Sequence, residues 1–249
     1  TDFLYRPRRP EELDTARGGG VVFSQAAHQV DIVRLLAGGR VEAVTARTGR
    51  WDPQRPTEGA YSALLDFAGG AFASLTYNGY GYYDTDALMD GIGEMGRPKA
   101  RGAHQQTRQK LMAATDETAE AALKAERNYG GAHYVPDAGE PPRAFQHFGP
   151  VIVCCDGADL RLTPSGVEVH DASGVRLESV PVPAIPRSEV IDELWSVARE
   201  GRAPLHGGAW SLATVEVCLA ILASAKDRAA IIPGRQVDLP TAAPPNARP

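Results

Sequence analysis

Residues 18–36 show the spacing of apolar positions that is typical of an α-helix, and they open with three glycines. At about 100° per residue, Ser24, His28 and Asp31 fall within one narrow sector of this helix. The apolar surface around the sector comes from Val22, Ile32, Val33 and Leu36. The pattern predicts a helix with one polar stripe, in which side chains four residues before and three residues after the histidine can hydrogen-bond its ring.

Two groups of strands are predicted by alternating apolar and polar positions. Residues 41–48 alternate in this way, and residues 60–67 and 71–77 indicate a hairpin around Gly69 and Gly70. A second group of short strands is separated by turn residues, which is typical of an antiparallel meander. Its members are residues 151–155, 159–162, 167–170 and 175–182.

Three further segments have the composition of helices. Residues 108–127 are rich in alanine, leucine, glutamate and lysine and predict a surface helix. A second helix is predicted over residues 188–199, with Ser188 as N-cap and Gly201 just past its end, and a third over 211–228. Loops are predicted over residues 79–107 and 129–145, and a disordered tail over 241–249.

Runs of strands flanked by helices, without strict alternation, indicate an α+β fold. We expect a mostly antiparallel open sheet with helices packed on one face. With 249 residues, 43% hydrophobic and 23% charged, the composition is that of an ordinary folded domain. The net charge of -5 argues against general nucleic-acid binding, which favours a basic surface.

The cysteines and the apolar runs indicate in which cellular compartment the protein is expected. Three cysteines, two of them adjacent, form neither a disulfide framework nor a Cys-x-x-Cys pair, which fits a reducing cytoplasm. The longest apolar run, residues 215–225, contains Glu216 and is shorter than the roughly 18 to 20 residues that cross a bilayer. We therefore expect no membrane partner.

His28 is the strongest candidate for chemistry, because neighbours on the same helix can fix which ring nitrogen faces outward, as proton transfer requires. The alternative is a histidine that is merely satisfied within a core helix. A metal at His28 and Asp31 would need two more ligands, so no metal is predicted. A Ser-His-Asp hydrolase is also disfavoured, since nothing around Ser24 has the pattern of a nucleophile elbow.

The three glycines, His28, Asp31 and the run 35–39 together resemble the first helix of the substrate domain in the Gfo/Idh/MocA family of NAD(P)-dependent oxidoreductases. Residues 208–210 and 219–225 extend the resemblance toward the end of the chain. Residues 3–14 and 147–156 further resemble the phthalate 4,5-dihydrodiol (4,5-dihydroxyphthalate) dehydrogenase branch. The family usually has an acidic residue four positions before the histidine, where this chain has Ser24.

This resemblance implies that residues 1–240 form the substrate-binding and oligomerisation domain of a dehydrogenase. NAD or NADP would be bound mainly by an N-terminal nucleotide-binding domain that is expected to precede residue 1. The implied reaction is the oxidation of a carboxylated cis-dihydrodiol by hydride transfer. His28 would take the hydroxyl proton, and Ser24 and Asp31 would orient its ring. A homo-oligomer through the sheet face is also expected.

Two alternatives to this function stay open at this point. One is a sugar or inositol dehydrogenase of the same family. The other is a non-catalytic assembly or ligand-binding module. Binding of polyols rather than carboxylated substrates would distinguish the first, and the absence of a nucleotide-binding domain in the intact protein would favour the second.

A dicarboxylate substrate needs cations, preferably guanidinium groups that grip a carboxylate at two points. The candidates nearest in sequence to the histidine helix are Arg6, Arg8, Arg9 and Arg17. His147 lies beside a predicted loop and is a further candidate for a polar contact with the substrate. The alternative for the arginines is a solvated arm.

One Gly-x-Gly-x-x-Gly motif occurs at residues 91–96. A dinucleotide-binding motif follows a buried strand and opens a helix, whereas Arg97, Pro98 and Lys99 follow this one without a helical pattern. We therefore expect this motif not to bind the cofactor, and no cofactor-binding residue is assigned within the chain.

Overall fold

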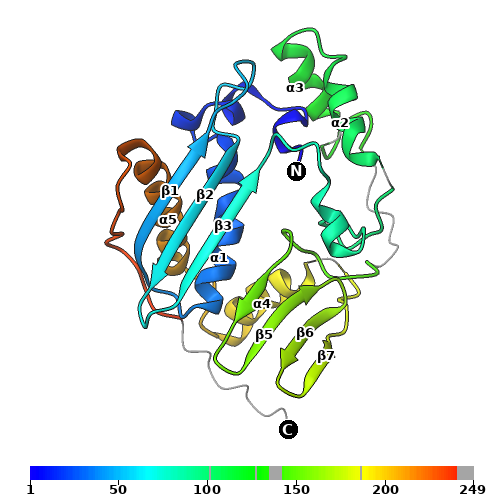
Figure 1. Ribbon diagram of the computed structural model, residues 1–249. Coiled ribbons are helices and arrows are strands. Elements are labelled where there is room, and N and C mark those ends of the chain that lie inside the picture. Colours follow the sequence, from blue (N-terminus) through cyan, green and yellow to red (C-terminus); the bar gives the residue numbers. More distant parts are fainter. Residues whose placement is uncertain (101, 127, 135–141, 186, 240–249) are drawn as a thin grey trace.

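Two separate antiparallel sheets form the framework of the computed structural model, which describes residues 1–100, 102–126, 128–134, 142–185 and 187–239 (Figure 1). The first sheet has the order β1-β2-β3, with β1 at Val41–Gly49, β2 at Ala60–Phe67 and β3 at Phe72–Asn78. The second has the order β4-β5-β6-β7, with strands at Ile152–Cys154, Ala158–Thr163, Gly166–Asp171 and Gly174–Ser179. Both predicted groups of strands are confirmed, as is the α+β class.

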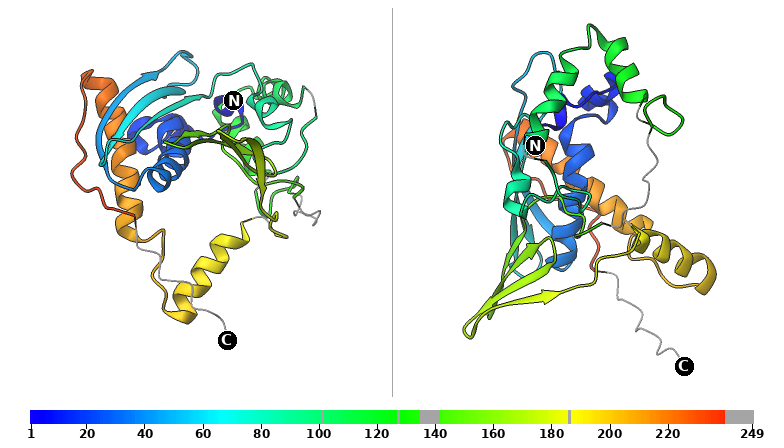
Figure 2. Two further views of the ribbon diagram at one scale, coloured as in Figure 1. Left: turned by 60° about the horizontal axis from the view of Figure 1, so that its bottom comes forward. Right: turned by 90° about the vertical axis from the view of Figure 1, so that its right-hand side faces the viewer.

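One face of the first sheet is covered by two helices, α1 and α5, which carry the main core between them and the sheet (Figures 1 and 2). Val44, Leu65 and Ile221 are fully buried there, whereas Leu64 on the opposite face of β2 is exposed. The hairpin between β2 and β3 turns at Gly69 and Gly70, whose φ angles of +93° and +89° suit glycine. The alternation along the strands therefore separates a packed face from an open one.

Helix α5 (Gly208–Asp227) has the length and the mean hydropathy, 1.6, of a membrane-crossing segment. In this fold it serves the core instead, because it packs along β1 and its buried side chains face the sheet. The Ser224 hydroxyl accepts a hydrogen bond from the Ala46 amide at 2.9 Å and donates one to the Ala229 carbonyl oxygen at 2.7 Å. Core helices of folded domains share the composition of this segment.

The predicted histidine helix is confirmed in position but is irregular at its start. It begins at Gly20, passes through a π-helical turn, η4 (Val22–Ala26), and continues as α1 (Ala27–Leu36). Gly20 has φ of +88°, and a Cβ there would lie 2.0 Å from a carboxylate oxygen of Glu58. The same carboxylate accepts from the Val22 amide at 3.2 Å, so it caps the helix start where a side chain at residue 20 would collide.

The buried face of this helix differs from the predicted one. Leu36 is 53% exposed, whereas Arg34 is fully buried. A π-helical turn adds a residue to the helical repeat and so rotates the positions before it relative to those after it. Ser24 and His28 therefore do not share the narrow sector that a constant 100° per residue predicts.

The segment between the two sheets contains more helix than predicted. A 3₁₀ helix, η5, spans Thr85–Met89, and α2 (Ala103–Leu111) begins inside the predicted loop. The single helix expected over residues 108–127 is wrong: α2 ends at Leu111, and α3 starts at Glu117 and runs to Ala125. Asp116 ends the break because its carboxylate accepts the Ala119 amide at 2.8 Å as an N-cap. The predicted loop 129–145 and tail 241–249 lie partly and wholly outside the described residues.

Helix α4 (Ser188–Glu200) stands away from the first sheet and has no buried residue (Figure 2). Gly201 follows it in a left-handed conformation, as predicted. The predicted N-cap is wrong: Ser188 is the first helical residue, and the capping position is Arg187, with φ of +63° and no side-chain cap. Three short 3₁₀ helices, η1 to η3, shape the N-terminal segment at Phe3–Tyr5, Pro10–Leu13 and Thr15–Arg17.

Candidate functional site

His28 lies near the start of α1, with its side chain exposed on one side. Its imidazole stacks on the Phe148 ring, with centroids 4.3 Å apart and planes inclined by 11°. Phe148 belongs to the segment that leads into β4. This contact therefore joins α1, which packs on the first sheet, to the segment that precedes the second sheet. Such stacking fixes the plane of an imidazole without occupying its nitrogens.

The surroundings of His28 favour its neutral form. Partial burial lowers the pKa of His28 below its ordinary value, and the nearby Arg187 guanidinium lowers it further. The carboxylates of Asp31 and Glu94 oppose this shift but do not cancel it. At neutral pH the ring is therefore uncharged and can accept a proton.

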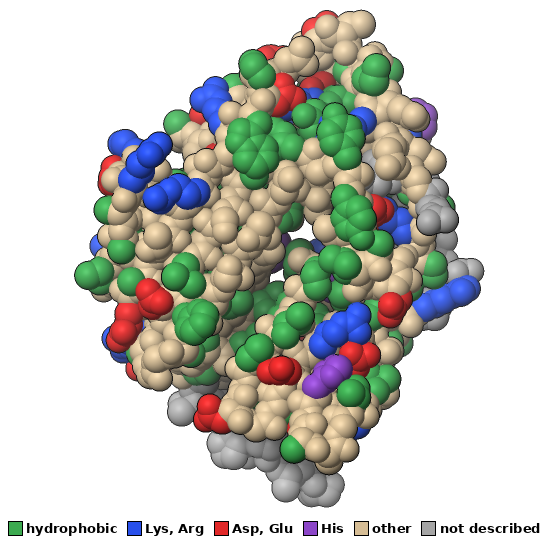
Figure 3. All heavy atoms as spheres, viewed as in Figure 1, with side chains coloured by type: hydrophobic (Ala, Val, Ile, Leu, Met, Phe, Trp, Pro, Cys, Tyr) green, Lys and Arg blue, Asp and Glu red, His purple; other side chains and the backbone are tan. Residues whose placement is uncertain are grey.

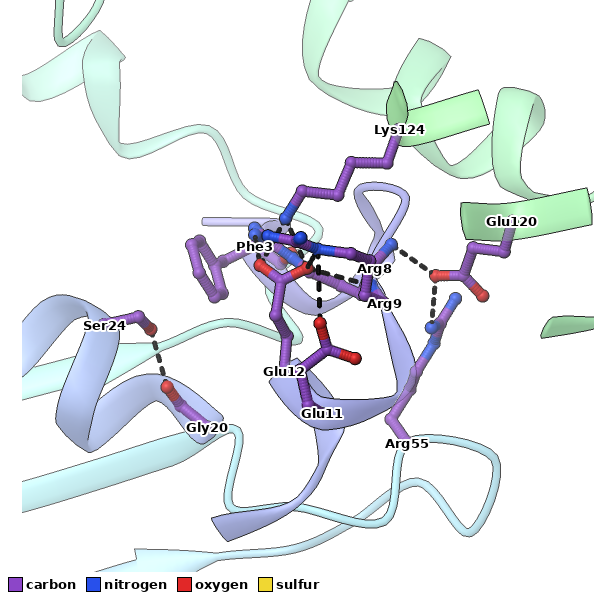
Figure 4. Close-up of polar contacts among 10 residues, drawn as sticks. All are labelled: Phe3, Arg8, Arg9, Glu11, Glu12, Gly20, Ser24, Arg55, Glu120 and Lys124. Atoms are coloured by element: carbon purple, nitrogen blue, oxygen red, sulfur yellow. Dashed lines mark hydrogen bonds and ion pairs between the residues drawn. The ribbon is translucent and has the colours of Figure 1, made fainter. Parts of the chain in front are cut away.

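Ser24 does not orient His28 in this structure. Its hydroxyl donates to the carbonyl oxygen of Gly20 at 2.6 Å, within the helix start (Figure 4). Serine side chains commonly bond the carbonyl four residues back in this way. The predicted hydrogen bond from Ser24 to the ring is wrong, because the π-helical turn lies between the two positions and the hydroxyl already has a backbone partner.

Asp31 is likewise engaged elsewhere. One carboxylate oxygen accepts from the Trp210 indole N–H at 2.6 Å and from the Thr214 hydroxyl at 3.2 Å. The other lies 3.3 Å from Nε2 of His206. No hydrogen bond joins Asp31 to the ring of His28 within the described part of the chain, so the predicted direct contact is wrong. Asp31 instead fastens α1 to the start of α5.

Arg34, one turn further along α1, completes this junction and was not predicted from the sequence. Its Nε donates to the Gly39 carbonyl at 2.9 Å, and its Nη1 donates to the Trp210 carbonyl at 3.0 Å and the Thr214 hydroxyl at 2.6 Å. The guanidinium also lies 3.9 Å from the centroid of the Trp210 ring. These contacts fix α1, and hence His28, against α5.

Arg8 and Arg9 of the N-terminal segment are occupied within the chain (Figure 4). The Arg8 guanidinium lies 3.6 Å from the Phe3 ring centroid and donates to the Phe3 carbonyl oxygen at 3.3 and 3.0 Å. It also pairs with Glu12 at 3.4 Å. Arg9 pairs with Glu11 at 3.4 Å and with Glu12 at 3.7 Å. A substrate carboxylate would have to displace these partners, so the geometry supports a role for both arginines in holding the segment together.

Arg6 is better placed than its neighbours. It pairs with Asp2 and with Glu94, each at 3.4 Å, and lines a cavity of about 250 Å³ to which Glu94 and Lys99 also contribute. Glu94, in the wall of this cavity, also acts on His28, since its carboxylate charge raises the pKa of the imidazole. Arg17 is exposed at the end of η3, away from these contacts.

His147 has both ring nitrogens in use. Nε2 lies 2.9 Å from the Ile92 carbonyl oxygen, and Nδ1 accepts the Gly149 amide at 3.1 Å. The ring is 4% exposed. In this geometry His147 binds the segment before β4 to the loop of residues 84–99 and thereby places Phe148 against His28. The predicted substrate contact has no free nitrogen to make it.

A polar pair beside His28 was missed from the sequence. The Tyr61 hydroxyl donates to Oε1 of Gln29, and the Tyr61 and Tyr77 rings stack with centroids 6.1 Å apart. Burial raises the pKa of Tyr77 to about 12, so its phenol stays protonated at neutral pH. Gln29 follows the histidine directly, but only the fold brings the two tyrosines of β2 and β3 to it.

The glycine motif at residues 91–96 does not have the arrangement of a dinucleotide-binding loop. It follows η5, and its own Ile92 forms an isolated bridge with Pro98. The amides of Gly91, Gly93 and Gly96 already donate to the carbonyls of Asp86, Arg97 and Gly93. They are therefore unavailable to a pyrophosphate. The motif serves packing instead, since a Cβ at Gly96 would lie 2.1 Å from the Ala144 carbonyl oxygen.

Two further features limit the chemistry of the described residues. Within the described ranges, no three side chains of His, Cys, Asp or Glu converge as metal ligands would. Cys154 and Cys155 are exposed and Cys218 is buried, all as free thiols. The site at His28 therefore offers an imidazole with a lowered pKa, a stacked aromatic ring and the nearby Arg187 guanidinium, which suits a polar organic substrate.

Comparison with known proteins agrees with this domain type. Residues 2–97 match the family model described as the GFO/IDH/MocA C-terminal domain. A dehydrogenase from Comamonas testosteroni, the 1-carboxy-3-chloro-3,4-dihydroxycyclohexa-1,5-diene dehydrogenase, is 44% identical over 229 residues, which cover 91% of this chain and 57% of that protein.

Solved structures give the same picture. The crystal structure of a protein described as the putative dehydrogenase from Bordetella bronchiseptica RB50 superimposes with a TM-score of 0.83 at 38% identity, over 93% of this chain and 60% of that one. An oxidoreductase from Agrobacterium radiobacter, solved with NAD+, L-tartaric acid and magnesium, shares the fold with a TM-score of 0.50 at 16% identity, over 84% of this chain and 47% of that one. This chain belongs to the GFO/IDH/MocA family. It spans about three fifths of the length of its two more similar relatives.

Proposed function

We propose that this chain is the substrate-binding part of an NAD(P)-dependent dehydrogenase that oxidises a carboxylated cyclic cis-dihydrodiol. The observation that carries the proposal is His28, an imidazole held neutral by its surroundings and by a neighbouring guanidinium. The 44% identical Comamonas protein is named for a carboxylated cyclohexadiene diol, which supports the substrate class. A phthalate-type dicarboxylate is the more specific form of the proposal.

In this reaction a ring nitrogen of His28 accepts the proton of the substrate hydroxyl. The lowered pKa of His28 favours the neutral imidazole, which can accept this proton at neutral pH. Phe148 holds the plane of the ring, and Asp31 and Arg34 hold the helix that carries it. Asp31 thus contributes through the position of α1, and Ser24 contributes through the helix start.

The hydride acceptor, NAD or NADP, is bound in this proposal by a nucleotide-binding domain outside residues 1–240. The glycine motif of this chain does not fit a dinucleotide, as its amides are used by backbone carbonyls. The greater length of the relatives leaves room for such a domain. The NAD+ complex of the Agrobacterium oxidoreductase, which shares this fold, supports the cofactor.

Arg6 is the proposed substrate-binding residue of the N-terminal segment, because it lines a cavity whose Glu94 carboxylate also acts electrostatically on His28. Arg8, Arg9 and Arg17 contribute through the conformation and charge of the same segment. A guanidinium that exchanges a carboxylate partner within the chain for one on a ligand keeps its charge balanced.

A homo-oligomer through the sheet face is part of the proposal. Figure 3 shows apolar side chains among polar ones over the outer faces of both sheets. Leu64 and Phe72 are exposed on the first sheet, and Val175 and Leu177 on the second. Light scattering at micromolar concentration tests the assembly, and a monomer would contradict it. The free thiols fit a cytoplasmic location, which fractionation of cells would test.

The experiment for the reaction itself is His28→Ala in the complete enzyme, assayed with NAD+ or NADP+ and a carboxylated cis-dihydrodiol. We expect kcat to fall by about two to four orders of magnitude, the usual contribution of a general base. The fold, followed by circular dichroism, should be unchanged because the imidazole is exposed on one side. Near-normal turnover by the folded variant would overturn the assignment of His28.

A further inference from the structure

Arg187 stands out by its backbone conformation. It directly precedes α4 and has φ of +63°, a left-handed value that it shares with only two other non-glycine residues of the described chain, Asp90 and Arg228. A side chain in this region costs roughly 1 to 2 kcal/mol relative to an ordinary conformation. Such a cost persists where the surrounding structure demands it, and it often marks a functional position.

The guanidinium of Arg187 is also uncommitted. Arg6, Arg8 and Arg34 are each held by carboxylates or carbonyl oxygens of this chain. Within the described ranges, Arg187 has neither an ion pair nor a side-chain hydrogen bond, and its side chain is exposed. A solvent-exposed guanidinium with five N–H donors can bind a carboxylate at two points.

The position of Arg187 relative to His28 is set by a bridge between α4 and α1. His206 places Nε2 3.3 Å from the Asp31 carboxylate on α1 and Nδ1 2.8 Å from the Glu193 carboxylate on α4. The His206 amide donates to the same Glu193 carboxylate at 2.9 Å. Arg187 directly precedes α4, and with this helix held against α1 its positive charge lowers the pKa of the His28 imidazole.

We propose that Arg187 binds a carboxylate of the substrate and so determines that the enzyme selects acidic diols over neutral ones. The inference rests on the proposed function and identifies the residue that binds the carboxylate of the substrate. A carboxylate held by Arg187 beside α1 leaves the diol carbons of the ring to face His28. Arg6, at the cavity on the Glu94 side, is placed for a second carboxylate.

This arrangement has an electrostatic consequence. An unpaired guanidinium disfavours a proton on His28, and a bound carboxylate neutralises that effect. The pKa of His28 therefore rises when an acidic ligand binds, which makes the imidazole a stronger base only when the correct substrate is present. A neutral diol leaves the guanidinium unpaired and the base weaker.

The test compares Arg187→Asn with Arg199→Asn in the complete enzyme. Asparagine tolerates the left-handed region, so the first variant removes the charge without a new backbone cost. Arg199 lies in the last turn of α4, at the opposite end of the helix from Arg187, and serves as the matched control. The probes are 4,5-dihydroxyphthalate, 3,4-dihydroxybenzoate and catechol, which carry two, one and no carboxylates.

We expect Arg187→Asn to weaken binding of both acids by roughly 10- to 100-fold, the range of a charged hydrogen-bonded contact, and to change catechol binding by less than about threefold. Arg199→Asn should leave all three unchanged. Equal losses for the acids and catechol, or unchanged acid binding in Arg187→Asn, would overturn the assignment.

A second readout separates this inference from the proposed function. NMR titration of His28 should show its pKa rising on addition of 3,4-dihydroxybenzoate to the wild type, and no such rise in Arg187→Asn. If the wild type oxidises an acidic diol while Arg187→Asn binds acids normally, Arg187 is wrongly assigned and the function stands. If no carboxylated diol is oxidised but acid binding still depends on Arg187, the function is wrong and the carboxylate site stands.

Discussion

The two sheets use similar alternating sequences in different ways. In the first sheet, α1 and α5 bury the apolar positions of one face, and Val44 and Leu65 are fully inaccessible. In the second, all residues of β7 are exposed, and α4 has no buried residue. An alternating pattern therefore establishes that a strand has two faces, but burial depends on what lies over them. The first sheet carries the main core, while the second presents surface.

The candidate site lies where these two regions meet. His28 comes from the helix of the first, and Phe148 and Arg187 come from the segments that lead into β4 and α4 of the second. In the proposed reaction, the firmly packed region supplies the base, and the exposed region supplies its surroundings. A site at such a junction can change specificity through the exposed part without loss of the core.

The largest stability difference should separate the two regions. Ile221→Ala in α5 deletes a fully buried side chain and should lower the free energy of unfolding by about 2 to 5 kcal/mol. Leu177→Ala in β7, where the side chain is 49% exposed, should cost less than about 1 kcal/mol. Urea unfolding measures both. Equal losses in the free energy of unfolding would show that the second sheet is as firmly packed as the first, which would contradict the difference described above.

Arg34→Met tests the polar junction inside the first region. The change leaves the carbonyls of Gly39 and Trp210 without their buried donor, so we expect a loss of about 2 to 3 kcal/mol in the free energy of unfolding. Arg40→Met is the control, since its ion pair with Asp238 is exposed and such pairs contribute little to the free energy of unfolding. A loss from Arg34→Met no larger than the control's would mean that the junction is dispensable.

Phe148→Ala tests the contact across the junction. Loss of the stacked ring should lower the free energy of unfolding by about 0.5 to 1.5 kcal/mol. It should also expose the imidazole to solvent, so the pKa of His28 should rise toward its ordinary value. NMR titration follows the ring directly. Phe72→Ala, at an exposed position on the first sheet, should leave the titration unchanged. An unaltered pKa in Phe148→Ala would show that the stacking does not shield His28.

The smallest effect should come from His206→Gln and should depend on pH. The pKa of His206 is raised, chiefly by its hydrogen bond with Glu193 and also by Asp31. Its contribution to stability is therefore complete below the unfolded pKa of about 6.5 and disappears as pH rises through the folded pKa. The side chain is half exposed, so the difference between pH 6 and pH 9 should be about 0.5 kcal/mol. A loss in the free energy of unfolding that does not depend on pH would contradict the proposed bridge from His206 to Glu193 and Asp31.

Local patterns could predict the strands and the histidine helix, because alternation and helical spacing are properties of neighbouring residues. They could not predict the π-helical turn, which rotates Ser24 away from His28. The break before Asp116 had a local signal, an N-cap residue followed by acidic residues, that alanine-rich composition obscured. The burial of Arg34 depends on Trp210, 176 residues away, and no local pattern contains it.

The most direct measurement is the pH dependence of kcat/KM for a carboxylated cis-dihydrodiol, in the complete enzyme and in its His28→Ala variant. Because burial and Arg187 lower the pKa of His28, the wild-type profile should fall on the acid side with a midpoint below 6.5. This acid limb should be absent from the residual activity of His28→Ala. A wild-type midpoint above 6.5, or the same limb in both proteins, would contradict the assignment of His28 as the base.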